Sequence, residues 1–593
     1  MDTQTDLHWH FLRQMESLAW VESYTLTASG LPITAWHCAQ GVLLHTCDQG
    51  RMEALCPFDT LLQSSPLACG EKIAFFAENP AQQNDLQLYL FDRESGQLFS
   101  PPLAATSRKR SLAWLDQRYL LTVQVMPEGA NLVLIDSENE QEPRILLPLP
   151  GKERWIDPLP VVGPEGQVLF TIRAEGVQHL LLLDWRRGTQ RILLRGNKSA
   201  RPITGCWSPD GKQLICFVQR ARTFEALLLD VPSGKMCRLD VPALREVPQW
   251  RPDGRQILLT VDSWPAPTLW LYDLQTRQMS AFPVPEGLVA SAPCWQDDRC
   301  YFIASAPAEP PALWCWETSP NRLRRMTPHY DLPPLSWPEV LLLPTPLAFA
   351  LPCLFFKPQG ERKPKGTVLA LHGGPSGYWQ IGWDPVTLAL VLAGYQVMLV
   401  NTRGSTLHAY PLPPVEPGKY GQTEVEDIGF CLEALQRQGL ADPAAMILLG
   451  YSHGAFVAYR ATVQYERSFR AAILASGYLR PQDLLQSRDP EAHALFSFGF
   501  AAQEEAHPAE TKLPVHCPLL IIHGAHDPQI PLQAMQASYQ QLTGAAHELL
   551  LLPGEGHAYR GRRNIILWIS TALKFIDGFI MEEGFSQCKQ STM

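Results

Sequence analysis

Residues 446–460 read Met-Ile-Leu-Leu-Gly-Tyr-Ser-His-Gly-Ala-Phe-Val-Ala-Tyr-Arg. The first four residues form an apolar run typical of a buried strand, and the stretch from Ala455 has helical character. Between them, two glycines flank Ser452. A strand-to-helix turn this tight has no room for side chains beside the serine, and it holds the hydroxyl out for attack. The pattern therefore predicts a nucleophilic serine at Ser452; the alternative is a serine that caps a helix.

Similar apolar runs recur after about residue 330, alternating with helical stretches. They are Thr367–Leu371, Val397–Val400, Met446–Leu449, Ala472–Ala475, Leu519–Ile522 and Leu549–Leu552. Strands so uniformly apolar are buried on both faces, which indicates a mostly parallel sheet covered by helices. Active sites of such sheets lie at the carboxyl ends of the strands. Polar motifs that directly follow these runs are therefore the candidates for a site.

A nucleophilic serine needs a base to take its proton and a carboxylate to orient that base. In α/β hydrolases these residues follow one another as Ser, Asp and His. Asp527 comes after the run Leu519–Ile522, and His557 comes after Leu549–Leu552. We therefore predict Ser452, Asp527 and His557 as a catalytic triad.

Three other residues compete for these roles. His523 and His526 adjoin Asp527, but they would have to fold back on it to act as the base. Glu555 is the rival carboxylate, yet two residues from His557 it is badly placed to reach across and hold the imidazole. We expect the histidines to be loop residues and Glu555 to have a surface or supporting role.

An oxyanion hole requires two hydrogen-bond donors aimed at the developing charge. One is expected to be the backbone N–H group of His453, the residue after the nucleophile. The other is expected from the motif His372-Gly-Gly-Pro375, where glycines allow close approach of the backbone, and we choose Gly373. On its own this motif could be an ordinary glycine turn.

The first half of the chain has a different pattern, a repeat of short apolar strands that each end at an acidic residue. The acids are Asp48, Asp92, Asp136, Asp184, Asp230, Asp273 and Glu317, with spacings of 44, 44, 48, 46, 43 and 44 residues. A period of about 40–50 residues is typical of four-stranded β-propeller blades. Seven copies predict a seven-bladed β-propeller.

A second marker runs in phase with the first. Trp207-Ser-Pro-Asp-Gly211 recurs as Trp250-Arg-Pro-Asp-Gly254, with weaker copies at 164–166 and 295–298. Aspartate caps its own backbone and glycine supplies positive φ, so these are expected to be turns rather than metal sites. We predict an N-terminal segment over 1–21, an all-β propeller over 22–330 and an α/β-hydrolase domain over 331–593.

The whole set of motifs resembles the prolyl oligopeptidase family of serine peptidases, especially its acylaminoacyl-peptidase and dipeptidyl-peptidase-like branches. The motifs are Phe356-Lys-Pro358, the HGGP at 372–375, Gly394-Tyr395, Asn401-Thr-Arg-Gly-Ser405, Lys419-Tyr-Gly421 with Glu426-Asp427, GYSHG at 450–454, HGAHDPQIP at 523–531 and GEGH at 554–557. The resemblance implies hydrolysis of amide or ester bonds in small substrates through an acyl-enzyme, with the propeller restricting access. It also implies structural roles for Arg403 and Asp427.

The chain departs from the family pattern in three respects. Ala455 stands where relatives usually have a second glycine, and Thr406-Leu-His-Ala-Tyr410 replaces a Gly-Tyr-Gly segment. No counterpart is found of the paired glutamates with which dipeptidyl peptidases of the family hold a free amino terminus. The absence of this pair leaves open whether the protein acts on chain ends or within chains.

Composition limits the other possibilities. At 593 residues the chain is too long for one hydrophobic core, and 46% hydrophobic with 18% charged residues is typical of globular proteins. A net charge of −10 without a basic stretch argues against nucleic acid as a partner. The polar N-terminus and the prolines within the longest uncharged stretch, 340–356, predict a cytoplasmic protein with no membrane segment.

The 14 cysteines lack any zinc-ligand spacing, so we expect reduced thiols. Neither metal nor organic cofactor is expected, since serine, imidazole and water suffice for the chemistry.

The leading hypothesis is a peptidase for short peptides. An esterase, acyltransferase or peptide cyclase would use the same triad on a small acyl substrate, and a propeller interaction module with a relic hydrolase is the non-enzymatic alternative. Oligomeric state is not predicted.

Overall fold

The computed structural model divides the chain into two compact units. One consists of Ala19–Ala306 with Pro310–Tyr330, and the other of Met1–Leu18, Pro307–Glu309 and Asp331–Met593. The structure describes residues 7–590 except 28, 38–41, 49–50, 56–64, 80–81, 102–107, 127–128, 139–141, 151–154, 175–176, 198, 221–222, 361–362, 408–409, 488–489 and 501–511. The first blade begins at Trp20, close to the predicted start at residue 22.

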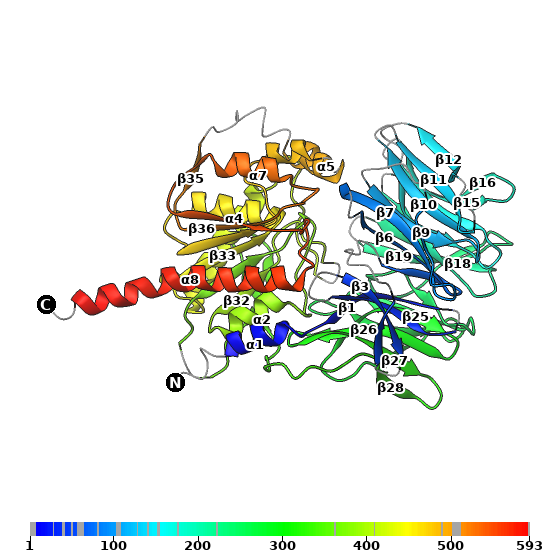
Figure 1. Cartoon of the computed structure of the whole chain (residues 1–593), viewed down its shortest axis with the longest axis horizontal. Coiled ribbons are helices and arrows are strands. Elements are labelled where there is room, and N and C mark those ends of the chain that lie inside the picture. The colour runs from blue at the N-terminus through cyan, green and yellow to red at the C-terminus, as the bar shows by residue number, and fades with distance from the viewer. Residues whose placement is uncertain are drawn as a thin grey trace. The chain divides into compact units, whose positions relative to one another are not determined.

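The first unit contains seven four-stranded antiparallel sheets, which confirms the seven-bladed propeller (Figure 1). Blade 1 consists of β1 (Trp20–Leu26), β2 (Pro32–His37), β3 (Val42–Asp48) and β4 (Arg51–Ala54). Blade 2 consists of β5 (Leu67–Cys69), β6 (Lys72–Asn79), β7 (Gln82–Asp92) and β8 (Leu98–Phe99). Blade 3 consists of β9 (Arg108–Trp114), β10 (Tyr119–Met126), β11 (Gly129–Asp136) and β12 (Arg144–Pro150). Blades 4 and 5 are β13 (Trp155–Val162), β14 (Val168–Ala174), β15 (Val177–Asp184) and β16 (Thr189–Arg195); and β17 (Arg201–Trp207), β18 (Gln213–Arg220), β19 (Thr223–Asp230) and β20 (Met236–Arg238). Blades 6 and 7 are β21 (Gln249–Trp250), β22 (Gln256–Val261), β23 (Thr268–Asp273) and β24 (Met279–Ala281); and β25 (Val289–Gln296), β26 (Arg299–Ala306), β27 (Glu309–Glu317) and β28 (Arg322–Arg325).

The repeated acidic residues all end the third strand of a blade. At five of these positions the aspartate accepts hydrogen bonds from backbone N–H groups two or three residues later, namely at Asp92, Asp136, Asp184, Asp230 and Asp273. Asp92 accepts from Glu94 and Ser95, and Asp273 accepts from Gln275 and Thr276. Turn capping therefore explains this marker. The second marker lies one hairpin earlier, between the first and second strands.

Apolar side chains of neighbouring blades meet in seven clusters, one for each pair around the ring. The tryptophans of the second marker contribute to them. The Trp250 indole donates to the backbone oxygen of Cys206 in the preceding blade at 3.0 Å, and Trp114 donates likewise to Leu67 at 3.0 Å. Trp250 thus both fills an interface and satisfies its own polar atom, and so does Trp114, which ends the first strand of blade 3.

The last blade packs directly on the first, without exchange of a strand. Val21, Trp36 and Cys47 of blade 1 share an apolar cluster with Tyr301 and Leu313 of blade 7. The side-chain amide of Gln296 also donates to the Thr27 oxygen at 3.2 Å. Side-chain packing and hydrogen bonds therefore close the ring.

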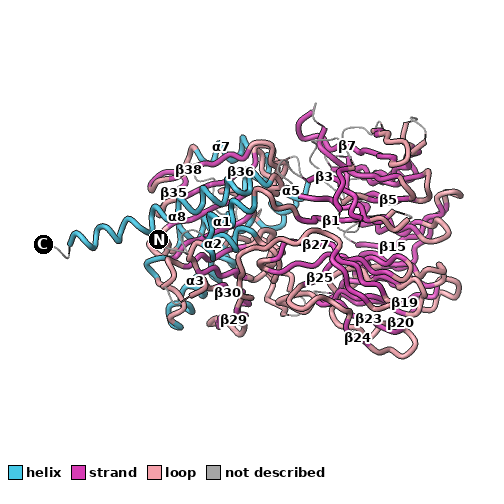
Figure 2. Tube along the Cα trace, turned by 60° about the horizontal axis from the view of Figure 1, so that its bottom comes forward, coloured by secondary structure: helices cyan, strands magenta, loops and turns pink. Residues whose placement is uncertain are grey.

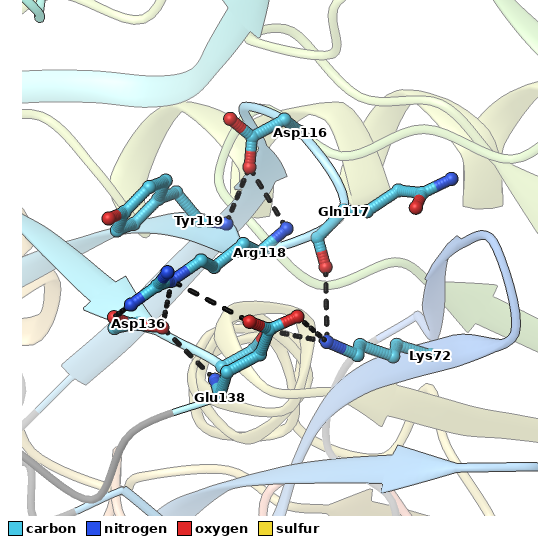
Figure 3. Close-up of polar contacts among 8 residues, drawn as sticks. Lys72, Asp116, Gln117, Arg118, Tyr119, Asp136 and Glu138 are labelled. Atoms are coloured by element: carbon cyan, nitrogen blue, oxygen red, sulfur yellow. Dashed lines mark hydrogen bonds and ion pairs between the residues drawn. The ribbon is translucent and has the colours of Figure 1, made fainter.

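Charged side chains add a polar contact between blades 2 and 3 (Figure 3). Arg118 donates to both carboxylate oxygens of the repeat residue Asp136, from Nε at 2.9 and 3.1 Å and from Nη2 at 2.7 Å, and these bonds lower the pKa of Asp136. Lys72 reaches across from blade 2 to the Gln117 oxygen and to Glu138. The group is exposed and balanced in charge, so its contribution to stability is expected to be small.

The second unit is built on one eight-stranded sheet with the order β29-β30-β32-β31-β33-β34-β36-β38. The strands are β29 (Glu339–Pro344), β30 (Ala350–Phe356), β31 (Thr367–Leu371), β32 (Gln396–Val400), β33 (Met446–Tyr451), β34 (Ala471–Ala475), β36 (Leu519–Gly524) and β38 (His547–Leu552). All neighbours from β32 to β38 are parallel, whereas β30 is antiparallel to both of its neighbours. The six predicted runs are the six parallel strands, which confirms the α/β-hydrolase fold.

Helices cover both faces of this sheet, and Figure 2 shows helices beside its strands. They are α1 (Leu7–Met15), α2 (Pro385–Leu392), α3 (Gln422–Gln438), α4 (His453–Gln464), α5 (Pro490–Gly499), α7 (Leu532–Tyr539) and α8 (Arg562–Gln590), with short turns η1 (Pro443–Ala445) and η2 (Pro481–Gln486) and a small parallel pair β35 (Leu513–Val515) and β37 (Leu542–Gly544). α3 packs on α4, while α1, α2 and α8 pack together. The N-terminal helix thus belongs to the hydrolase unit, which the sequence did not reveal.

Within the residues described above, no helix is both long enough and apolar enough to span a membrane. The uncharged stretch 340–356 is largely the hairpin of β29 and β30.

Candidate active site

The predicted nucleophile lies in a strained turn between β33 and α4. Ser452 has φ 51° and ψ −116°, a conformation that is rare for residues other than glycine. A Cβ on Gly450 would lie 2.2 Å from the Gly454 oxygen, and one on Gly454 would lie 2.4 Å from the His372 oxygen. Both glycines are therefore required by close backbone contacts, as the sequence predicted. The turn leaves the Ser452 hydroxyl beyond the carboxyl end of β33.

The structure brings the three predicted side chains into one hydrogen-bonded chain. The Ser452 hydroxyl lies 2.9 Å from Nε2 of His557, and Nδ1 of His557 lies 2.8 Å from Oδ2 of Asp527. A carboxylate can only accept, so Nδ1–H donates to Asp527 and Nε2 accepts from the serine. This tautomer allows the imidazole to take the serine proton.

The carboxylate is itself held in place. Oδ1 of Asp527 accepts hydrogen bonds from the N–H groups of Gln529 and Ile530, at 2.8 and 2.9 Å. The Asp527 side chain is fully buried, whereas that of His557 is 20% exposed. The two backbone donors thus hold Oδ1, while Oδ2 accepts from the His557 imidazole and orients it.

The rival histidines have other partners. His523 is fully buried, and its Nε2 lies 2.9 Å from the Ile530 oxygen but 4.0 Å from Asp527. Burial lowers the pKa of His523, which keeps the ring neutral. His526 contributes its backbone N–H to the Glu555 oxygen at 2.8 Å. Of the three histidines, His557 is the one whose ring bridges Ser452 and Asp527.

Glu555 is buried, only 2% exposed, and it organises the loop that carries His557. Its carboxylate accepts from the N–H groups of Arg560 and Gly561 and from the Asn564 amide, all at 2.8 Å. Tyr559 also ties this loop to the sheet, because its hydroxyl donates to the Ile522 oxygen at 2.8 Å. Glu555 therefore supports the loop that carries His557 through these hydrogen bonds, and it is buried rather than on the surface.

The two predicted oxyanion residues lie on either side of Ser452. His453 is the first residue of α4, so its N–H group belongs to the first turn, where no intrahelical acceptor exists. Gly373 follows β31, and a Cβ there would lie 3.3 Å from Cβ of Ser452 and 4.0 Å from its hydroxyl. His372 fixes the Gly373 peptide through a 2.8 Å contact of Nδ1 with the Gly373 oxygen.

Arg403 and Asp427 form a buried ion pair. The Arg403 side chain donates to Oδ1 of Asp427 at 2.8 Å, and its backbone N–H donates to Oδ2 at 2.7 Å. Burial raises the pKa of Asp427 to about 7, and Arg403 opposes that rise. The pair joins the loop after β32 to α3, consistent with a structural role.

Two residues near the nucleophile were not identified from the sequence. Glu424 and Tyr478 contact the ring of His453, at 3.0 and 2.7 Å. Glu424 lies within the segment 419–427 that contributed to the family resemblance, but nothing in that segment indicates which side chain it faces.

A serine, an imidazole and a carboxylate linked in this order beyond the strands of a doubly covered parallel sheet define the class of α/β-hydrolase-fold serine hydrolases. Comparison with known families then places the chain more narrowly. Residues 379–582 match the prolyl oligopeptidase family, and the chain carries a serine peptidase domain of that family. The matched region includes Ser452, Asp527 and His557, and the family recognised from the sequence is confirmed.

Known proteins with similar sequences are peptidases. The acylamino-acid-releasing enzyme of Homo sapiens is 25% identical over 401 residues, covering 62% of this chain and 50% of that protein, and the enzyme of Sus scrofa is 23% identical over 393 residues with the same coverage. Dipeptidyl-peptidase 5 of Porphyromonas endodontalis is 25% identical over 230 residues, covering 36% of this chain and 33% of that protein. The chain thus spans about half the length of the acylamino-acid-releasing enzymes it matches.

Solved structures share the fold over nearly the whole chain. A puromycin-hydrolyzing peptidase of Mycobacterium tuberculosis has a TM-score of 0.80 at 18% identity, covering 97% of this chain and 96% of that one. The acylaminoacyl peptidase of Pyrococcus horikoshii has a TM-score of 0.70 at 17% identity, covering 96% and 97%. At this identity the similarity establishes the architecture of propeller and hydrolase.

Proposed function

We propose that this protein hydrolyses short peptides through an acyl-enzyme on Ser452. His557 takes the hydroxyl proton as Oγ attacks the carbonyl carbon, and the N–H groups of His453 and Gly373 stabilise the resulting oxyanion. The C–N bond then breaks, and the amine leaves with the proton from His557. Water, deprotonated by the same imidazole, attacks the acyl carbon and releases the acid and Ser452. The continuous hydrogen bonding from Ser452 through His557 to Asp527 is the observation that carries the proposal.

The proposed substrates are short peptides, including N-acylated ones. Proteins with a similar sequence or fold are named acylamino-acid-releasing enzyme and puromycin hydrolase, which supports a small acylated or aminoacyl amide as substrate. The lack of a recognisable pair of glutamates for a free amino terminus points the same way. We also propose that the propeller restricts access to Ser452, so that long polypeptides are excluded as well as folded proteins.

The proposal can be tested with fluorogenic amides of blocked and unblocked short peptides, simple acyl esters, and a long unfolded polypeptide. Ser452→Ala serves as the control for each substrate. We expect the purified protein to cleave short peptide amides and to spare the long chain, and we expect Ser452→Ala to lose all cleavage while keeping its thermal transition.

Other outcomes would contradict the proposal. Cleavage of esters alone would indicate an esterase. Acyl transfer to an added amine in preference to water would indicate an acyltransferase or cyclase. Undiminished peptide cleavage by Ser452→Ala would show that Ser452 is not the nucleophile, and cleavage of the long polypeptide as fast as of short peptides would contradict the restriction of access.

A further inference from the structure

A second chain of buried polar side chains lies directly behind the nucleophile turn. It consists of Glu424 in the first turn of α3, His453 at the start of α4, and Tyr478 after β34. Nε2 of His453 lies 3.0 Å from Oε1 of Glu424, and Nδ1 lies 2.7 Å from the Tyr478 hydroxyl. The three residues are only 2%, 3% and 1% exposed, respectively. Three segments far apart in the sequence therefore meet on one imidazole.

The chemistry of these groups fixes the direction of both hydrogen bonds. The Glu424 carboxylate can only accept, so Nε2–H donates to it. In the neutral imidazole Nδ1 is then the acceptor, and the Tyr478 hydroxyl donates to it. Burial raises the pKa of Tyr478 well above its ordinary value, which keeps the hydroxyl a donor. Both ring nitrogens are thus occupied, and one tautomer of His453 is selected.

The residues around the His453 imidazole restrict its rotation. The Tyr478 ring stacks on Phe456 at 4.9 Å between centroids, and Phe500 packs against both. The second oxygen of Glu424 accepts from the Gly421 N–H at 2.9 Å, which anchors the carboxylate to the start of α3. The imidazole is therefore held by hydrogen bonds on two sides and by aromatic packing around them.

The fixed side chain of His453 also restricts the orientation of its backbone. Its N–H group is one of the two proposed oxyanion donors, and it is attached to the same Cα as the fixed imidazole. Oxyanion donors work because they are oriented before charge develops, and such orientation depends on the residues that support them. Ser452 next to it has a strained backbone, so an external anchor is needed to hold the peptide unit.

We infer that Glu424 and Tyr478 are positioning residues of the oxyanion hole, acting through the side chain of His453. The inference rests on the proposed function of Ser452 and His453. Loss of an oxyanion donor lowers kcat by roughly 100- to 1,000-fold. A donor that is retained but less well oriented should cost less, about tenfold.

The experiment compares Tyr478→Phe with Tyr395→Phe in the full-length protein. Both changes delete one buried tyrosine hydroxyl and keep the ring, and Tyr395 donates to Asp577 at 2.6 Å on a different part of the unit. Glu424→Gln is a second variant that retains the size of the side chain. Active sites are titrated with a phosphonate serine probe, so that misfolded molecules do not enter kcat.

For Tyr478→Phe and Glu424→Gln we expect kcat per titrated site and kcat/KM to fall together by about tenfold, because the lost interaction acts in the transition state. A peptide aldehyde, which forms a tetrahedral adduct with Ser452, should bind more weakly by a similar factor. Tyr395→Phe should change the thermal transition alone.

The inference is overturned if Tyr478→Phe and Glu424→Gln keep the wild-type kcat per titrated site and lose only thermal stability. It is equally overturned if the peptide aldehyde binds these variants as tightly as it binds the wild type. A wild-type protein that cleaves none of the peptides, or a fully active Ser452→Ala, would instead contradict the proposed function.

Discussion

Gly477 lies against Ala455, the residue at the position where members of the family usually have a second glycine. A Cβ on Gly477 would come within 2.4 Å of Cβ of Ala455 and within 3.3 Å of the Ser452 oxygen. The methyl group of Ala455 on α4 therefore fits only because residue 477 is a glycine and has no side chain. This pairing explains how the nucleophile turn accommodates an alanine.

Gly477→Ala should consequently be destabilising, by about 1–3 kcal/mol for overpacking of a buried site, and should lower activity because the strain falls on Ser452. The double variant Gly477→Ala with Ala455→Gly should recover most of both losses. Thermal unfolding and peptide cleavage of the wild type, Gly477→Ala and the double variant test this relationship. If the double variant is no better than Gly477→Ala alone, the contact between the two residues is not the cause.

His557→Ala should reduce kcat by at least about 1,000-fold, since removal of a triad member leaves only binding and the oxyanion hole. His523→Ala should cost less than tenfold in kcat, because its ring faces the Ile530 oxygen rather than Ser452. The His523 variant should instead unfold at lower temperature, since it leaves a cavity in a buried site. Steady-state cleavage of one peptide amide by both variants measures the difference, and a greater kcat loss in His523→Ala would mean that the base is assigned wrongly.

Glu555→Gln should lower both the thermal transition and kcat. The amide can replace one carboxylate oxygen but turns N–H groups toward backbone donors, and an unsatisfied buried group costs about 1–3 kcal/mol. The loop that carries His557 would lose one of its anchors. Glu548→Gln, on an exposed position of β38, is the matched control and should behave as wild type. Wild-type kcat in Glu555→Gln would show that His557 is positioned without this carboxylate.

Stability should fall with acidification below neutral pH, partly through His372. Burial lowers the pKa of His372 to about 4, below its value of about 6.5 in the unfolded chain. Between these two values the unfolded state binds more protons than the folded state, so the free energy of unfolding decreases as pH falls from about 6.5 toward 4. His372→Gln should flatten the dependence of the thermal transition on pH in this window, whereas the surface variant His516→Gln should not. An unchanged slope in His372→Gln would contradict the assignment.

Much of this architecture was predictable because its signals are local. Propeller turns need an aspartate to cap the backbone, so an acidic residue such as Asp92 or Asp273 recurs once in each blade. The strand-to-helix turn at Ser452 needs glycines on both sides for steric reasons, so GYSHG predicts both the fold and the nucleophile. Asp527 and His557 were predicted because each follows a buried parallel strand, and such strands end at a common edge.

Other features depended on the tertiary structure. His523 and His557 are both histidines near Asp527, and only the packing of β36 and β38 shows that the first faces Ile530 while the second reaches Ser452. The N-terminal helix α1 carries no local signal that attaches it to the hydrolase unit, since its buried Phe11 and Met15 could have covered any apolar surface.

The amino-acid sequence by itself thus determined the class of fold, with a propeller before a hydrolase, and the candidate nucleophile, because turn geometry and strand burial act on neighbouring residues. Only the tertiary structure decided which side chains meet. Glu424, His453 and Tyr478 are 29 and 25 residues apart along the chain, and their contact depends on how α3, α4 and β34 pack. No local pattern encodes such a meeting, since it arises from the core that all three elements share.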